Sequence, residues 1–179
     1  MNTNENNYFQ LFALAERFEL DMQQLTDNYR ALQRATHPDR FANASEKERR
    51  LSVQQAALVN DAFNTLKSPL LRATYLLSLR GVEVGAENNT AMDPMFLMEQ
   101  MELREALADV GDDDQAVDKI GGILDDIAAK MQSLTKALEN NFSAGTAAGL
   151  QEAAANVRKL QFFFKLQEEA ESVEARFDH

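Results

Sequence analysis

The sequence predicts an all-α protein, in which an N-terminal helical hairpin is followed by a three-helix bundle. Only 7 glycines and 3 prolines interrupt the 179 residues. The long stretches between them are rich in Ala, Leu, Glu, Gln and Lys, which favour helices. Within these stretches apolar residues recur at the three- and four-residue spacing of a buried helix face, and no strand-like alternation is visible.

The first helices of the hairpin are outlined by a cap and a proline. The apolar segment Tyr8–Phe12 predicts a short helix or turn. Asp21 can cap a longer helix, which must end near His37 because Pro38 lacks an N–H group and restricts the residue before it. The apolar stripe of this helix contains Met22, Leu25, Tyr29 and Leu32.

The second helix of the hairpin follows a loop over residues 37–44. Ser45 and Glu48 have the spacing of a capping box. Ser68-Pro69 marks its end, and a shorter helix is expected over residues 70–79. The buried stripe of the long helix is predicted to contain Leu51, Leu58, Val59, Ala62, Phe63 and Leu66.

The C-terminal half predicts three more helices. Residues 81–92 contain glycines and polar clusters and are predicted to be a linker. Asp93-Pro94 is an N-cap followed by a first-turn proline, which predicts a helix to about Val110. Two further helices are expected over roughly 115–140 and 150–176, with a turn at 143–149.

The expected domains, residues 1–80 and 93–179, differ in charge. Residues 1–80 hold ten Lys or Arg against nine Asp or Glu, whereas residues 81–179 hold eight against twenty. The two halves therefore present different electrostatic surfaces, which suggests different partners. The overall net charge of −11 argues against a general nucleic-acid binder, because phosphates would be repelled.

Several classes of function are poorly supported by the composition. The chain has no cysteine and only two histidines, so thiol catalysis, disulfides and the usual zinc sites are not expected. No segment is long and apolar enough for a membrane helix, and the first residues do not form a signal peptide. We therefore expect a cytoplasmic protein that is not an enzyme and uses no metal or cofactor.

The tripeptide His37-Pro38-Asp39 is the first candidate site. It could simply stop a helix, because all three residue types suit a helix end or a turn. Its context gives it more meaning. It lies between two amphipathic helices, beside an exposed face that carries Arg30 and Arg34.

The helix that starts at Asp93-Pro94 contains the second candidate. At about 100° per residue, one side of this helix can pack into the bundle through Phe96, Leu103, Leu107 and Val110. A Met-bearing apolar face outside the core suits an adaptable protein-binding surface, unless the hairpin or the linker covers it. The residues that point away from the core are Leu97, Met98, Met101, Glu102, Glu105 and Asp109.

Several segments together resemble a known family. Tyr8-Phe9 with Leu11-Phe12, the helix that ends at His37-Pro38-Asp39, and the helix through 60–66 resemble a J-domain. The match continues through residues 69–73, 75–77, 96–105 and 157–160. Together these segments look like HscB, the family of J-type co-chaperones of iron–sulfur cluster assembly.

The resemblance implies an L-shaped, two-domain protein that binds the scaffold IscU and delivers it to the DnaK-type chaperone HscA. The J-domain would stimulate the ATPase of HscA and so promote cluster transfer. The resemblance assigns chaperone binding to His37, Pro38, Asp39, Arg30, Arg34 and Arg40. It assigns scaffold binding to Leu97, Met98, Met101, Glu102, Glu105, Asp109 and Phe162.

Small departures from the family pattern keep the chemistry. Arg40 stands where many relatives have Lys, Met101 where one has Leu, and Asp109 where one has Glu. Phe162 is the first of three consecutive phenylalanines, which cannot all share one helix face, so at least one should lie off the core.

Three alternatives remain open from the residues. The chain could be a general J-domain co-chaperone with a different client. It could be a metal-dependent hydrolase that uses its Glu and Asp clusters, or a purely structural helical adaptor.

Overall fold

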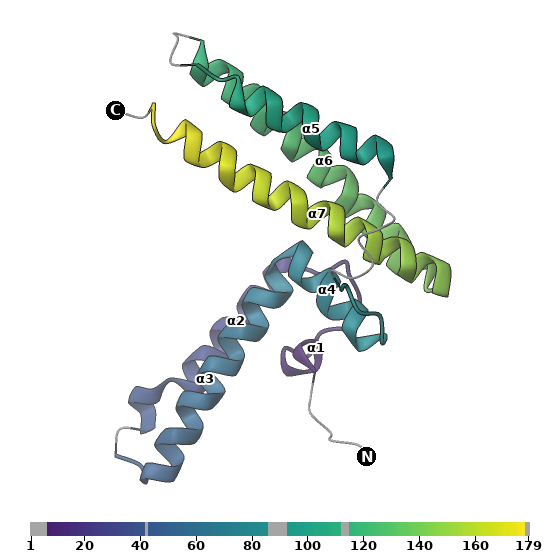
Figure 1. Cartoon of the computed structure of the whole chain (residues 1–179). Coiled ribbons are helices and arrows are strands. Elements are labelled where there is room, and N and C mark those ends of the chain that lie inside the picture. Colours follow the sequence, from purple (N-terminus) through teal and green to yellow (C-terminus); the bar gives the residue numbers. More distant parts are fainter. Residues whose placement is uncertain (1–6, 42, 86–92, 112–114, 178–179) are drawn as a thin grey trace. The chain divides into compact units, whose positions relative to one another are not determined.

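The computed structural model confirms the all-α fold. It describes residues 7–41, 43–85, 93–111 and 115–177, and no strand occurs within these ranges. The chain divides into two compact units, Met1–Arg80 and Gly81–His179 (Figure 1). The elements are α1 (Tyr8–Leu11), α2 (Met22–Thr36), a 3₁₀ turn η1 (Pro38–Phe41), α3 (Glu46–Lys67), α4 (Pro69–Leu79), α5 (Pro94–Ala108), α6 (Ala116–Ala144) and α7 (Ala147–Glu174).

An aromatic contact joins the short α1 to α4. The backbone N–H of Tyr8 donates to Oη of Tyr75 at 3.0 Å, and the two rings stack with centroids 4.5 Å apart. Partial burial raises the pKa of the Tyr75 hydroxyl above its ordinary value. Phe9, which follows in α1, is completely buried. The predicted apolar segment that begins at Tyr8 therefore forms a short helix, and this helix contributes to the core of the first unit.

The hairpin of α2 and α3 has the predicted boundaries. The carboxylate of Asp21 accepts hydrogen bonds from two backbone N–H groups in the first turn of α2. Leu25 is completely buried. Further along, the ring of Tyr29 stacks on Phe63 with centroids 4.0 Å apart, and its hydroxyl donates to Asn60 at 3.0 Å. α2 ends at Thr36, so His37-Pro38-Asp39 begins the connection to α3.

The predicted stripe of α3 is wrong at two positions. Leu51 and Leu58 are 47% and 46% exposed. The buried row lies one residue further along and consists of Ser52 with Val59 and Leu66, together with Ala62; the last three belong to the predicted stripe and are confirmed. The two rows share the same seven-residue spacing, so periodicity alone does not decide which of them packs against the hairpin partner.

The capping box at the start of α3 is confirmed. The Ser45 hydroxyl accepts from the backbone N–H of Glu48 at 3.3 Å, and the Glu48 carboxylate accepts from the backbone N–H of Ser45 at 2.9 Å. The Ser45 hydroxyl also donates to that carboxylate at 2.7 Å. These bonds, the side-chain bond foremost, lower the pKa of Glu48.

Replacing Ser45 by alanine is expected to lower the stability of the first unit by about 1 kcal/mol, the usual cost of losing an N-cap. The pKa of Glu48 should then rise toward its ordinary value, because its main hydrogen-bond donor is gone. In the unaltered protein, the stabilisation that comes from the lowered pKa of Glu48 is complete above the unfolded pKa of this carboxyl group. It is lost as the pH falls through the lowered folded pKa. Urea unfolding and a carbon-13 titration of Glu48 measure both effects, and an unchanged Glu48 pKa would contradict the assignment.

The second unit is built on α6 and α7, two long helices that lie side by side with α5 packed along them (Figure 1). Phe96 and Leu103 of α5 enter a shared core with α6 and α7. The other buried members of this core are Ile123, Ile127, Phe163, Leu166 and Ala170. The predicted core face of α5 is confirmed, since Leu107 and Val110 also pack against this cluster.

The turn between α6 and α7 is much shorter than predicted. α6 continues to Ala144, Gly145 adopts a left-handed backbone (φ +61°), and Thr146 already caps α7 by accepting from the N–H of Gly149. A Cβ atom at Gly149 would lie 2.9 Å from the carbonyl oxygen of Asn141. Glycine therefore allows the two helices to approach closely at this end.

Other predictions fall partly on residues that are not described. Residues 86–92 of the predicted linker lie outside the described residues, as do residues 112–114, which fall between the helix predicted to end near Val110 and the helix predicted to begin near residue 115.

Candidate partner-binding surfaces

The tip of the hairpin is a compact, exposed turn. Asp39 donates its backbone N–H to Nδ1 of His37 at 3.3 Å, and Arg40 donates its own to the carbonyl oxygen of His37 at 3.1 Å. Nδ1 of His37 also lies 3.6 Å from a carboxylate oxygen of Asp39. The Asp39 side chain is 91% exposed and the His37 side chain 53%. Both polar groups are available to a partner in a geometry that local hydrogen bonds hold.

The three arginines near this tip lie in two arrangements. Arg30 and Arg34 are exposed on α2, one turn apart. Arg40 folds back, because its guanidinium donates to the carbonyl oxygen of Arg34 at 3.3 Å. The structure therefore brings Arg34, Arg40 and Asp39 to the same end of the hairpin, and Arg30 extends this basic surface along α2.

The side of α5 opposite its core residues forms an exposed apolar surface. Leu97 is 45% exposed, Met98 58% and Met101 62%. Glu102, Glu105 and Asp109 are also exposed and fringe this surface. The sequence analysis did not identify Met95, which is 71% exposed. Its position one turn before Met98 could have placed it on the same exposed face. We call the residues Met95, Leu97, Met98 and Met101 the α5 apolar face.

Phe162 lies at the edge of the core rather than on the open surface. Its ring is half-buried and meets Phe96 and Phe163 edge-on, with centroids 5.8 Å and 5.5 Å away. The guanidinium of Arg104 lies 5.3 Å from the centre of the Phe162 ring and 3.9 Å from a carboxylate oxygen of Glu169. Phe163 is the buried member of the phenylalanine triplet.

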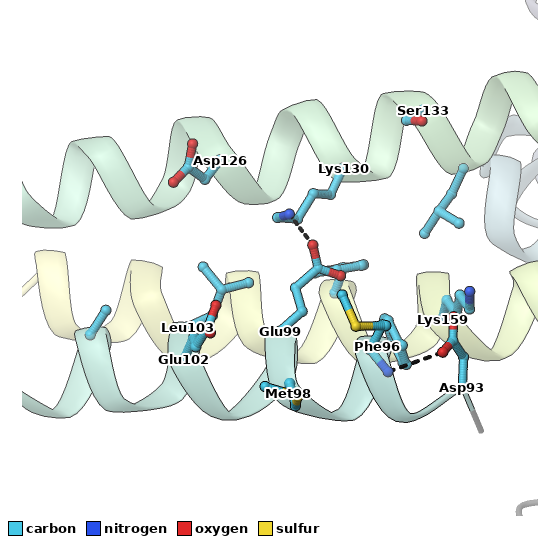
Figure 2. A pocket seen from close by; sticks show the side chains of 14 residues that line it. Asp93, Phe96, Met98, Glu99, Glu102, Leu103, Asp126, Lys130, Ser133 and Lys159 are labelled. Carbon is cyan, nitrogen blue, oxygen red and sulfur yellow. Dashed lines mark hydrogen bonds and ion pairs between the residues drawn. The ribbon is translucent and has the colours of Figure 1, made fainter.

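A groove of about 780 Å³ runs along the other edge of α5, between α5 and α6. Figure 2 shows Glu99 reaching across it to form an ion pair with Lys130. Lys159 of α7 lies with its ammonium 5.2 Å from the centre of the Phe96 ring. The walls are formed by Asp93, Met95, Phe96, Met98, Glu99, Glu102, Leu103, Ala106, Asp126, Lys130, Ser133, Leu134, Lys159 and Phe163.

These surfaces have the chemistry of protein binding. In the described part of the chain, no three His, Asp or Glu residues converge as a metal site would require. No described helix is sufficiently long and apolar to cross a membrane. Exposed thioether and aliphatic side chains fringed by carboxylates are what an adaptable protein interface offers.

Comparisons with known proteins agree with this chemistry. Residues 92–171 match the family described as the HSCB C-terminal oligomerisation domain. A co-chaperone protein HscB homolog from Shewanella loihica is 47% identical over 94% of this chain and 97% of its own length. Another from Shewanella oneidensis is 48% identical, with the same shares covered.

Solved structures give the same result. Chaperone HscB from Vibrio cholerae superposes with a TM-score of 0.84 at 44% identity, covering 96% of this chain and 99% of that one. Human co-chaperone protein HscB gives a TM-score of 0.85 at 32% identity, covering 96% of this chain and 83% of that one. The chain therefore belongs to the HscB family, the J-type co-chaperones of iron–sulfur cluster assembly.

Proposed function

We propose that this chain binds an iron–sulfur scaffold protein of the IscU type through α5 and delivers it to a DnaK-type chaperone of the HscA type. At the chaperone, the tip of the hairpin stimulates ATP hydrolysis. Cluster transfer from the scaffold is thereby promoted, while the chain itself, which has no cysteine, supplies no thiolate ligand to the cluster.

One observation carries the scaffold part of this proposal. The core of the second unit already uses Phe96 and Leu103, so the exposed Leu97, Met98 and Met101 add nothing to its burial. Apolar groups left in water at neighbouring positions are favourable only when a partner covers them. We assign the contact to Leu97, Met98, Met101, Glu102, Glu105, Asp109 and Phe162.

The chaperone part is supported by the geometry at the hairpin tip. Asp39 presents an exposed carboxylate that can form a directional, charge-assisted pair with an arginine. Arg30 and Arg34 on α2 can meet an acidic surface and speed the encounter. We assign the contact to His37, Pro38, Asp39, Arg30, Arg34 and Arg40.

Delivery by one chain predicts more than additive stimulation. The steady-state ATPase of purified HscA is measured with the full-length chain alone, with IscU alone and with both. We expect the combined stimulation to exceed the sum of the separate ones by roughly threefold or more, because a chain that holds both partners raises their effective concentration. A strictly additive result would contradict delivery.

A further inference from the structure

The α5 apolar face does not end at the edge of its own helix. Met95, Met98 and Glu102 belong both to the exposed side of α5 and to the wall of the groove between α5 and α6. The opposite wall is formed by α6, from which Asp126, Lys130 and Ser133 line the groove (Figure 2). The partner surface is therefore continuous with a cleft that has a second helix as its far side.

The basic side chains of this groove have partners, whereas two of its carboxylates form no ion pair in the described part of the chain. Lys130 is paired with Glu99, and Lys159 lies against the Phe96 ring. Glu102 and Asp126 stand on opposite walls (Figure 2), and within the described residues neither takes part in an ion pair. The groove thus presents two unpaired carboxylates beside exposed methionines, which is complementary to a cation next to an apolar side chain.

The other edge of α5 has the opposite character. There Arg104 lies over Phe162 and pairs with Glu169, so this edge presents a guanidinium that already has an acidic partner. A cationic group of a partner would gain little beside the Arg104–Glu169 ion pair, but it would be attracted between Glu102 and Asp126. The charge difference between the two edges gives the partner a preferred side.

We propose that the scaffold partner extends from α5 into the α5–α6 groove and seats there a segment in which an arginine or lysine is next to an apolar residue. The apolar residue packs on Met95 and Met98, and the cation lies between Glu102 and Asp126. Asp126, Ser133 and Met95 are then contact residues for the scaffold, which extends the interface from α5 onto α6. This inference rests on the scaffold binding proposed above.

Two adjacent aspartates allow a closely matched test. Asp125 and Asp126 are both exposed on α6, but only Asp126 lines the groove. The affinity of the full-length chain for purified IscU is measured by calorimetry for Asp126→Lys and Asp125→Lys, which have the same net charge. We expect Asp126→Lys to weaken binding about tenfold, because the new lysine would lie beside the cation of the scaffold segment. Asp125→Lys should change the affinity by less than about twofold.

The apolar wall and the position of the partner are tested in the same way. Met95→Ala should weaken binding about fivefold, whereas truncating Val117, an exposed residue of α6 outside the groove, should have almost no effect. Because the chain has no cysteine, Ser133→Cys and Gln132→Cys can each carry one photo-crosslinker. The scaffold should be captured from position 133 in the groove and not from position 132.

The outcomes separate the two proposals. If the unaltered chain does not bind IscU, the proposed function fails and the groove inference fails with it. If the unaltered chain binds but Asp126→Lys and Asp125→Lys behave alike, and crosslinking does not distinguish 133 from 132, only the groove inference is overturned. The scaffold then lies on α5 and the Phe162 edge alone.

Discussion

Replacement of His37 by glutamine is expected to reduce stimulation of the chaperone ATPase to a tenth or less, a loss of about 1.4 kcal/mol or more in activation free energy. Nδ1 of His37 accepts the backbone N–H of Asp39 at 3.3 Å. The amide oxygen of glutamine is attached one bond further from the backbone than Nδ1, on a flexible chain, so it does not hold an acceptor at that place. The backbone of Asp39 would then lose this hydrogen bond, and its exposed carboxylate would be presented less uniformly to the proposed chaperone partner.

The measurement is single-turnover ATP hydrolysis by HscA at saturating concentrations of the chain. Binding of the variant to IscU serves as its control and should be unchanged, because His37 and the α5 apolar face belong to different units. A His37→Gln chain that stimulates hydrolysis as well as the unaltered chain would make the hairpin tip irrelevant and favour a structural adaptor.

The charge at the tip can be separated from its shape. Asp39→Asn removes the charge but retains a side chain of the same size, and it should also lose most of the stimulation. Asp27→Asn is the matched control, because Asp27 is an exposed carboxylate on α2 whose hydrogen-bond partner among the described residues is the side chain of Gln23. Loss in both variants would indicate a general charge effect rather than a specific pair.

The combined replacement of Leu97, Met98 and Phe162 by alanine is expected to weaken scaffold binding by about 100-fold, or about 2.7 kcal/mol. Leu97 and Met98 would each lose apolar area that only the partner covers. Phe162 contributes differently, since its ring also packs on Phe96 and Phe163 within the bundle. Removing it would therefore lower the stability of the second unit as well as the affinity.

The double variant Leu97→Ala/Met98→Ala avoids this complication. Both side chains are exposed in the free protein, so thermal unfolding should be almost unchanged while the affinity measured by calorimetry falls about tenfold or more. Leu51→Ala/Leu58→Ala is a suitable control, because it truncates two similarly exposed leucines on α3. Equal loss in both double variants would show that binding depends on general surface hydrophobicity.

The features of the fold that depend on neighbouring residues could be predicted from the sequence. Asp21 and Ser45 determine helix starts through their side-chain hydrogen bonds, and Pro38 ends a helix because it lacks an N–H group; the structure has these ends where they were expected. The core side of α5 was predictable for a similar reason, since Phe96 and Leu103 are seven residues apart on one side of a helix. Periodicity is a local property.

Features of the fold that depend on how two helices pack against each other could not be predicted from local sequence patterns. The choice between the row of Leu51 and that of Ser52 is made by the packing of α3 against its neighbours. The groove needs α6 beside α5, and nothing near Asp126 in the sequence indicates that it faces Glu102. The roles of the individual site residues rest on the family pattern and remain predictions.

The close contact at Gly149 has a mechanical consequence for the whole second unit. α6 and α7 extend about 42 Å from their tight turn, so a small change in the angle between them becomes a large displacement at their far ends. A change of one degree in the angle between them moves their far ends by roughly 0.7 Å. A side chain at Gly149 would push Asn141 away and open this angle. A methyl group at Gly149 would thus shift the surface of α6 and α7 on which α5 packs, without contacting any residue that the proposed function assigns to a partner.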